Sequence, residues 1–99
     1  MDQCVAEISG KTFPVVNWSQ GGALVFVDDR MFGKEERLEV TLKFHLQDRI
    51  VPIQNKAKVL RKGFGRMAVQ FDSVNDDSRR AYQQIIDDIT TRAFADSQA

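Results

Sequence analysis

Residues 38–46 constrain the fold of this chain more than any other segment. Apolar and polar side chains alternate through all nine residues, and the apolar positions are Leu38, Val40, Leu42, Phe44 and Leu46. Because successive side chains of a β-strand point to opposite faces, this period of two predicts a strand with one buried face and one solvated face. A helix would instead bring every third or fourth residue to one face, so an all-helical chain is excluded.

Five other segments before residue 72 have the composition of short strands, and turn-forming residues separate them: 5–8, 12–18, 23–27, 50–61 and 66–71. The segment 23–27 is wholly apolar, which is compatible with burial on both faces. Pro14 cannot donate a hydrogen bond within a sheet, so the second strand is expected to be an edge or to carry a bulge there.

The last quarter of the chain has the pattern of an amphipathic helix. Its apolar side chains recur at helical spacing and would form one stripe: Ala81, Tyr82, Ile85, Ile86, Ile89 and Ala93. Asn75 or Asp76 can cap its N-terminus. We therefore predict a mainly β domain of residues 1–95, a six-stranded antiparallel barrel with one C-terminal helix, followed by a frayed tail of residues 96–99.

Composition excludes several classes of protein. Lys+Arg and Asp+Glu number 14 each, so the net charge favours neither a nucleic-acid nor a membrane partner. The longest apolar run, residues 23–27, is far shorter than the ~20 residues of a membrane helix, and the first residues do not resemble a signal peptide. We expect no direct membrane insertion and a cytoplasmic location, either free or as the cytoplasmic domain of a membrane-associated protein. Cys4, the single cysteine, fits this reducing compartment.

Residues suited to catalysis are scarce. His45 is the single histidine and falls on the polar face of the alternating strand, and nothing near Cys4 in the sequence would stabilise a thiolate. Three Asp-Asp pairs occur, but neighbouring side chains on a strand or helix point apart and do not chelate a metal. We expect a protein that is not an enzyme, with no metal and no cofactor.

Residues 49–71 carry six basic side chains and no acidic one: Arg49, Lys56, Lys58, Arg61, Lys62 and Arg66. Two interpretations stay open, namely lysines that keep edge strands from aggregating and a surface that faces an anion. Together with Phe64, this hairpin would also suit a small nucleic-acid-binding barrel. The zero net charge and the scarcity of exposed aromatic residues argue against that function, so we expect no nucleic-acid partner.

The segment Asn17-Trp18-Ser19-Gln20-Gly21-Gly22 carries the most specific polar chemistry. The Asn17 amide offers donors and acceptors that can read the edge of a nucleobase, and the Ser19 hydroxyl can bond a base or a phosphate. Gly22 lets a ligand approach the backbone. The same residue types are usual in plain turns, so on its own the pattern leaves both interpretations open.

The order of these segments resembles that of a PilZ domain over nearly the whole chain. Residues 17–22 resemble the family motif Asp/Asn-x-Ser-x-x-Gly, and Phe32-Gly33 followed by residues 38–46 resembles its loop and long alternating strand. Residues 57–61 resemble the strand that ends in Val-x-Arg. Residues 67–71 resemble the Gly-hydrophobic-x-Phe strand, with Ala68 in place of the usual glycine.

PilZ domains are six-stranded barrels that bind the bacterial second messenger cyclic di-GMP. The resemblance implies ligand contacts from Asn17, Ser19 and Gly22, with Trp18 and Gly21 as accessory residues. It implies a sensor module that acts on other domains or proteins of a secretion, polysaccharide or motility system. Trp18 beside the motif is similar to PilZ modules joined to exopolysaccharide or membrane-fusion secretion proteins, which points to exopolysaccharide regulation.

The chain departs from the family at the Arg-x-x-x-Arg motif that precedes the first strand, because its first arginine is Arg30. We expect a domain excised from a larger bacterial protein; the alternative is a degenerate protein-interaction barrel that does not bind nucleotide. Arginines pair with phosphates bidentately, and each charge-assisted hydrogen bond contributes roughly 1.5–3 kcal/mol. This chain alone is therefore expected to bind cyclic di-GMP weakly or not at all.

Overall fold

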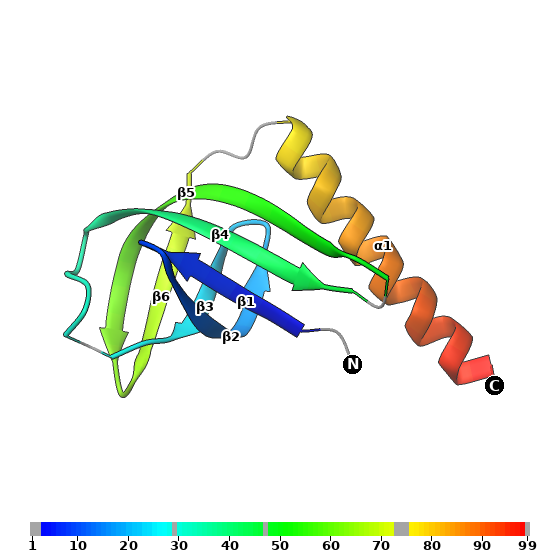
Figure 1. The fold of residues 1–99 in the computed structure, drawn as a ribbon, viewed down its shortest axis with the longest axis horizontal. Coiled ribbons are helices and arrows are strands. Elements are labelled where there is room, and N and C mark those ends of the chain that lie inside the picture. The colour runs from blue at the N-terminus through cyan, green and yellow to red at the C-terminus, as the bar shows by residue number, and fades with distance from the viewer. Residues whose placement is uncertain (1–2, 29, 47, 73–75, 99) are drawn as a thin grey trace.

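The computed structural model describes residues 3–28, 30–46, 48–72 and 76–98, and the side chains from residue 4 to residue 91 within these ranges. The elements are β1 Gln3–Ile8, β2 Lys11–Ser19, β3 Gly22–Phe26, β4 Arg37–His45, β5 Ile50–Gly63, β6 Arg66–Phe71 and α1 Asp76–Gln98. The strands form a closed antiparallel barrel in the order β1-β2-β3-β6-β5-β4 (Figure 1). The predicted six-stranded barrel with one C-terminal helix is confirmed.

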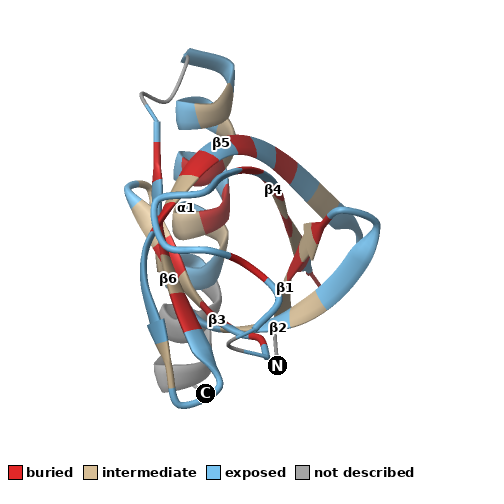
Figure 2. Cartoon of the chain, turned by 90° about the vertical axis from the view of Figure 1, so that its left-hand side faces the viewer, coloured by how far each residue is buried: buried red, intermediate tan, exposed pale blue. Residues whose placement is uncertain are grey.

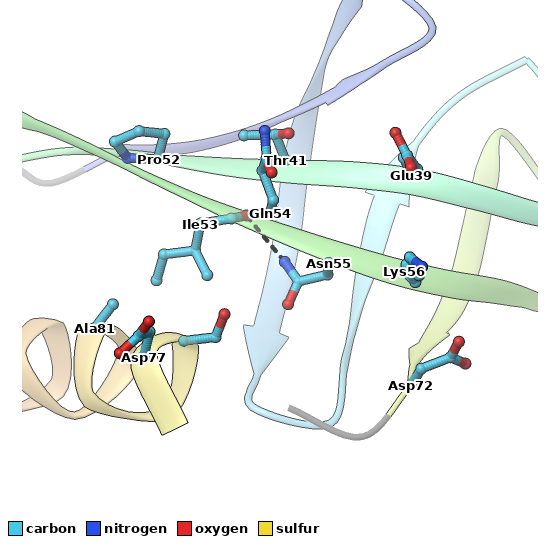
Figure 3. A pocket seen from close by; sticks show the side chains of 11 residues that line it. Glu39, Thr41, Pro52, Ile53, Gln54, Asn55, Lys56, Asp72, Asp77 and Ala81 are labelled. Atoms are coloured by element: carbon cyan, nitrogen blue, oxygen red, sulfur yellow. Dashed lines mark hydrogen bonds between the residues drawn. The ribbon is translucent and has the colours of Figure 1, made fainter. Parts of the chain in front are cut away.

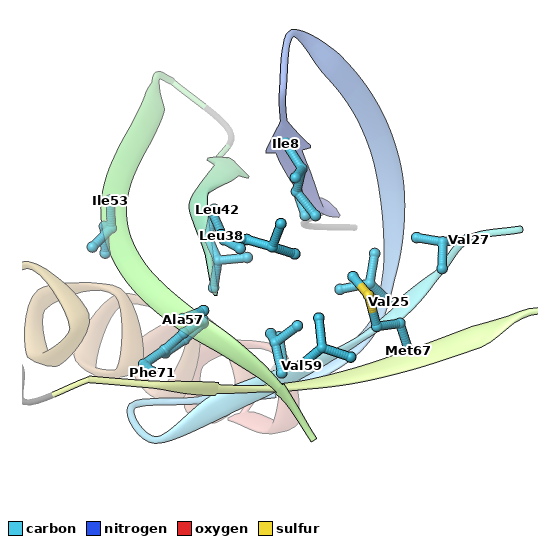
Figure 4. Close-up of a cluster of buried hydrophobic side chains, with 14 of the residues drawn as sticks. Ile8, Val25, Val27, Leu38, Leu42, Ile53, Ala57, Val59, Met67 and Phe71 are labelled. Carbon is cyan, nitrogen blue, oxygen red and sulfur yellow. The ribbon is translucent and has the colours of Figure 1, made fainter. Parts of the chain in front are cut away.

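Alternation along the strands builds the barrel core. All five apolar positions of residues 38–46 are buried, and Ile53, Ala57 and Val59 follow the same pattern in β5. These side chains meet those of β3 and β6 inside the barrel (Figure 4). The interpretation of residues 23–27 as a strand buried on both faces was wrong. Leu24 is half-buried and Phe26 is exposed. The reason is that a strand in the wall of a barrel has only one face toward the core.

Two of the hairpins have two-residue turns with positive φ at both central residues. Ser9 and Gly10 join β1 to β2 with φ of 53° and 80°, and Phe64 and Gly65 join β5 to β6 with φ of 56° and 75°. This is the geometry of the type I′ turn, whose twist matches that of the flanking strands. Pro14 lies just before the β2–β3 ladder, which begins at Val15, so its missing donor costs nothing on that side.

Helix α1 packs against the barrel through its apolar stripe (Figures 1 and 2). Tyr82 and Ile85 are fully buried, and the Tyr82 hydroxyl donates a hydrogen bond of 2.8 Å to Oδ1 of the buried Asn55. Asn55 in turn donates to the carbonyls of Ile53 and Val40, so this buried amide is satisfied. These contacts fix the helix over one opening of the barrel.

The ends of α1 differ in part from the expectation. The helix begins at Asp76; Asn75, the other candidate cap, and the Ala93 side chain lie outside what the structure describes. It extends to Gln98, beyond the predicted boundary at residue 95. Ile89 is partly exposed, so the apolar stripe is covered mainly near Tyr82 and Ile85.

Candidate ligand-binding face

The motif residues Asn17 and Ser19 end strand β2, and Gly22 begins β3. Both polar side chains are exposed on the outside of the barrel. Trp18, between them, points to the other side of the strand. Its ring packs edge-on against Phe44, with ring centroids 4.7 Å apart, and is stacked on Tyr82 at 5.8 Å. Trp18, expected as an accessory ligand residue, therefore joins the wall of the barrel to α1.

The turn between β2 and β3 uses most of its polar groups internally. The Gly21 amide donates a hydrogen bond of 3.1 Å to the Ser19 hydroxyl oxygen, and the Phe71 amide donates one of 2.9 Å to the Gly21 carbonyl. A Cβ on Gly22 would lie 2.3 Å from the Val69 carbonyl oxygen, closer than any side chain can approach. The fold itself therefore requires a glycine at position 22 and favours a hydroxyl at position 19.

Asn17 is the motif residue whose side chain the fold leaves free. Val15 pairs with Val25 and Asn17 pairs with Leu24, so Val16 is an additional residue in β2, a β-bulge. A β-bulge changes the face of the strand to which the following side chains point, and after this bulge Asn17 points outward. Among the described residues the Asn17 amide has no hydrogen-bond partner. It is therefore available to a ligand.

The strand registers extend the motif into a four-strand surface. One outward row runs from Asn17 in β2 through Leu24 and Ala68 to Arg61 in β5. A second runs from Ser19 through Gly22 and Gln70 to Lys58. We call these eight residues the motif face. With strands about 4.8 Å apart, Asn17 and Arg61 stand about 14 Å apart at the backbone.

The motif face combines small residues in its middle with cations at one end. Gly22 has no side chain and that of Ala68 is a single methyl group, so a flat ligand can lie close to the backbone there. Lys58 lies 3.6 Å from the Glu35 carboxylate, whereas Arg61 is exposed and forms no ion pair with a described residue. The sequence alone did not predict that Asn17 and Arg61 lie on the same surface, because it is the pairing registers of β2, β3, β6 and β5 that bring the two residues together.

A cleft of about 600 Å³ lies elsewhere, between β4, β5 and the start of α1 (Figure 3). Its polar lining includes Glu39, Asp72, Asp77 and Lys56. Its innermost amide, that of Asn55, is already bonded to the barrel and to Tyr82. None of the expected ligand residues lines this cleft.

The titratable groups offer little chemistry. Burial raises the pKa of the Cys4 thiol to about 12 and raises the pKa of Tyr82 as well, so both stay protonated near neutral pH. His45 is exposed. In the part of the chain that the structure describes, no group of three His, Cys, Asp or Glu side chains could hold a metal ion, and no helix is long and apolar enough to cross a membrane.

Comparisons with known proteins agree with this architecture. The sequence model of the PilZ domain matches residues 3–88, so the chain belongs to the PilZ domain family. The crystal structure of an uncharacterized Legionella protein is similar, with a TM-score of 0.62 at 18% identity over 92% of this chain and 90% of that one. At that identity the likeness shows the fold alone. No curated protein sequence matches the chain significantly.

The predicted family is thus confirmed, and it is a family of regulatory modules of the type that binds cyclic di-GMP. The structure places Asn17, Ser19 and Gly22 together on one outer surface, with Gly21 in the turn that joins them. Their contacts with a nucleotide, and the accessory roles of Trp18 and Gly21, stay predictions.

Proposed function

We propose that this chain is a non-catalytic regulatory module that responds to cyclic di-GMP, and that the motif face receives the nucleotide. The observation that carries the proposal is the position of Asn17. It is exposed and has no partner among the described residues, and it shares an outward row with Arg61, which forms no ion pair with any of those residues. Membership of the PilZ domain family supports the same ligand class.

Each residue of the motif has a separate task in this proposal. The Asn17 amide pairs with the edge of a guanine, which offers both donors and acceptors. The Ser19 oxygen already accepts the Gly21 amide, and its hydroxyl proton remains able to donate to a phosphate. Gly22 leaves the ligand room, and the guanidinium of Arg61 supplies a charge-assisted contact to a phosphate oxygen.

Binding by these 99 residues alone is weak in our proposal. The first arginine is Arg30, which follows β3, so no arginine segment lies ahead of β1 in this sequence. Arg61 is one cation at the far end of the motif face and does not replace two arginines that enclose a ligand. Nucleotide binding then shifts the population of an adjoining segment, and that shift is read by a cytoplasmic protein of a secretion, polysaccharide or motility system.

An NMR titration of the labelled chain with cyclic di-GMP tests the proposal. We expect amide shifts at Asn17, Ser19, Gly22 and Arg61, with a Kd above the micromolar range. The variant Asn17→Ala should lose most of the shifts. The matched control is Gln54→Ala, which removes an exposed amide at the cleft between β4, β5 and α1. This variant should keep the shifts.

Two outcomes contradict parts of this proposal. Calorimetry that gives a sub-micromolar Kd would overturn weak binding by the isolated chain. A titration with no shifts on the motif face favours the alternative, a degenerate interaction barrel that binds no nucleotide. The contacts of Ser19 and Gly22 favour that alternative, because the turn and the approach of β6 already account for both residues.

A further inference from the structure

The β5 side of the β5–β6 hairpin extends past the end of β4, while its β6 side stays bonded to β3 as far as the pair Phe26–Arg66 and the hydrogen bond from the Val27 amide to the Gly65 carbonyl. The β4–β5 ladder ends at the pair Arg37 and Lys58, and the loop before β4 bonds β5 only as far as Val59. From there to the turn, β5 pairs with β6 alone. We call residues 62–66 the hairpin tip; in Figure 1 it lies at the lower left, at the end of the barrel away from α1.

Phe64 occupies the turn in a way that the fold does not require. Its side chain is fully exposed and packs against no residue of the described ranges. Its φ of 56° lies in the left-handed region, which is costly for a bulky residue, and the preferred partner of Gly65 in such a turn is asparagine. A residue that is both strained and exposed gives no stability, so its presence points to a binding role.

The surroundings of Phe64 are cationic and partly apolar. In the sequence Arg61, Lys62 and Arg66 flank it, and residues 49–71 contain no acidic side chain; the nearby acidic group is the Asp28 carboxylate of the adjoining loop, which interacts with Lys62. The guanidinium of Arg66 lies 5.6 Å from the ring centroid of Phe26, which is itself 43% exposed. The tip therefore presents one aromatic ring, and a second ring, that of Phe26 under the Arg66 guanidinium, lies on the adjoining strand β3. The edge-strand explanation does not hold for Lys56 and Lys58, which lie within the β4–β5 ladder, and it holds only for the part of β5 beyond Val59, where one edge has no neighbouring strand.

We propose that the hairpin tip docks reversibly on an anionic phospholipid surface. Phe64 enters the interfacial layer, and Lys62 and Arg66 meet the headgroup phosphates. One fully exposed aromatic ring at a turn can enter a soft interface, whereas a folded partner would need a matching pocket. Single-stranded nucleic acid would need several stacking rings along a groove. Such docking spans no membrane and does not depend on the nucleotide.

Vesicle flotation tests this proposal with the wild-type chain and two vesicle compositions. We expect binding to phosphatidylglycerol-containing vesicles that weakens with salt, and little binding to phosphatidylcholine alone. Phe64→Asn should reduce binding roughly tenfold or more while the melting temperature rises, since a fold defect cannot explain weaker binding by a more stable protein. Ile50→Asn removes a 58% exposed apolar residue at the other end of β5 and should leave binding unchanged.

The charges are tested separately. The double variant Lys62→Gln and Arg66→Gln should weaken binding and flatten its salt dependence. Equal flotation of wild type and Phe64→Asn would overturn the proposal, as would equal binding to neutral and anionic vesicles. Phe64-dependent binding to single-stranded oligonucleotides without vesicle binding would assign the tip to nucleic acid instead. The cyclic di-GMP titration of Phe64→Asn is expected to match wild type, so the two proposals fail independently.

Discussion

The β2–β3 and β5–β6 hairpins lie in the same wall of the barrel, yet they use their turn residues in opposite ways. In the first, the Ser19 hydroxyl, the Gly21 carbonyl and the missing side chain of Gly22 all serve contacts within the fold. In the second, Phe64 is strained and its side chain is fully exposed. The barrel accounts for the first turn; in the second it accounts for the Gly65 carbonyl, which accepts the Val27 amide, but not for Phe64.

This difference changes how a sequence motif should be interpreted. Ser19 and Gly22 would be retained in a barrel that had lost its ligand, because the turn and the approach of Val69 need them. Their presence therefore says little about nucleotide binding. Asn17 and Phe64 have no such internal explanation among the described residues, and they are the positions where substitution reports on function rather than on folding.

The largest expected effect in this comparison is that of Gly22→Ala. The added Cβ meets the Val69 carbonyl oxygen in the neighbouring strand, and neither backbone can move without breaking the β3–β6 ladder. We expect the free energy of unfolding to fall by about 1–3 kcal/mol in urea titrations. Gly21→Ala is the matched control, because its Cβ would lie at an ordinary 3.8 Å from the Ser19 hydroxyl oxygen. Equal stability of the two variants would contradict the packing argument.

The next effect has the opposite sign. Phe64→Asn places a residue that accepts left-handed φ next to Gly65, and we expect the free energy of unfolding to rise by about 1 kcal/mol. Ser9→Asn makes the same change in the β1–β2 turn, where φ is 53° and the wild-type residue is already small and polar. Its gain should be smaller. Destabilisation by Phe64→Asn would show that the ring supports the hairpin after all.

The sequence predicts much of the fold because its periodicities are local. Alternation over residues 38–46 correctly identifies the half-buried strand β4, and the helical stripe correctly identifies the buried Tyr82 and Ile85. The same alternation could also have predicted that the Trp18 side chain points toward the core. If Asn17 and Ser19 point outward, the residue between them points inward, as its contacts with Phe44 and Tyr82 show.

The motif face could not be predicted, because it depends on irregularities in pairing. Val59 faces the core, so strict alternation would turn Arg61 inward as well. Leu60 is an additional residue between the pairs Val59–Val69 and Arg61–Ala68, and this bulge turns Arg61 outward. The contact between Gly22 and the Val69 carbonyl likewise joins segments that no local pattern links.

A smaller effect distinguishes structure from ligand binding within the β2–β3 turn. Ser19→Ala removes an exposed hydrogen bond to the Gly21 amide, so we expect a loss of about 0.5 kcal/mol in the free energy of unfolding. Asn17→Ala breaks no bond among the described residues and should leave stability unchanged in the same urea titration. If Asn17→Ala proves more destabilising than Ser19→Ala, then Asn17 has a structural role, and the argument that its side chain is available to a ligand fails.

The smallest effect concerns Asp28, which follows Val27, the residue whose amide donates a hydrogen bond to the Gly65 carbonyl in the β5–β6 turn. Hydrogen bonds from the Arg30 side chain and backbone lower the pKa of Asp28 from 3.8 to about 2, and the positive charge of Lys62 adds to this.

Because the folded-state pKa lies below the ordinary value, the stabilisation from Asp28 is present above about pH 4 and is lost as the pH falls toward 2. An NMR titration of the Asp28 carboxyl carbon should give a midpoint near 2. Arg30→Gln should raise that midpoint markedly, whereas Lys62→Gln should raise it only slightly, since its influence is purely Coulombic. A large shift from Lys62→Gln would mean that the Lys62 side chain, too, is held by the neighbouring loop, and the contrast of the hairpin tip with the β2–β3 turn would weaken.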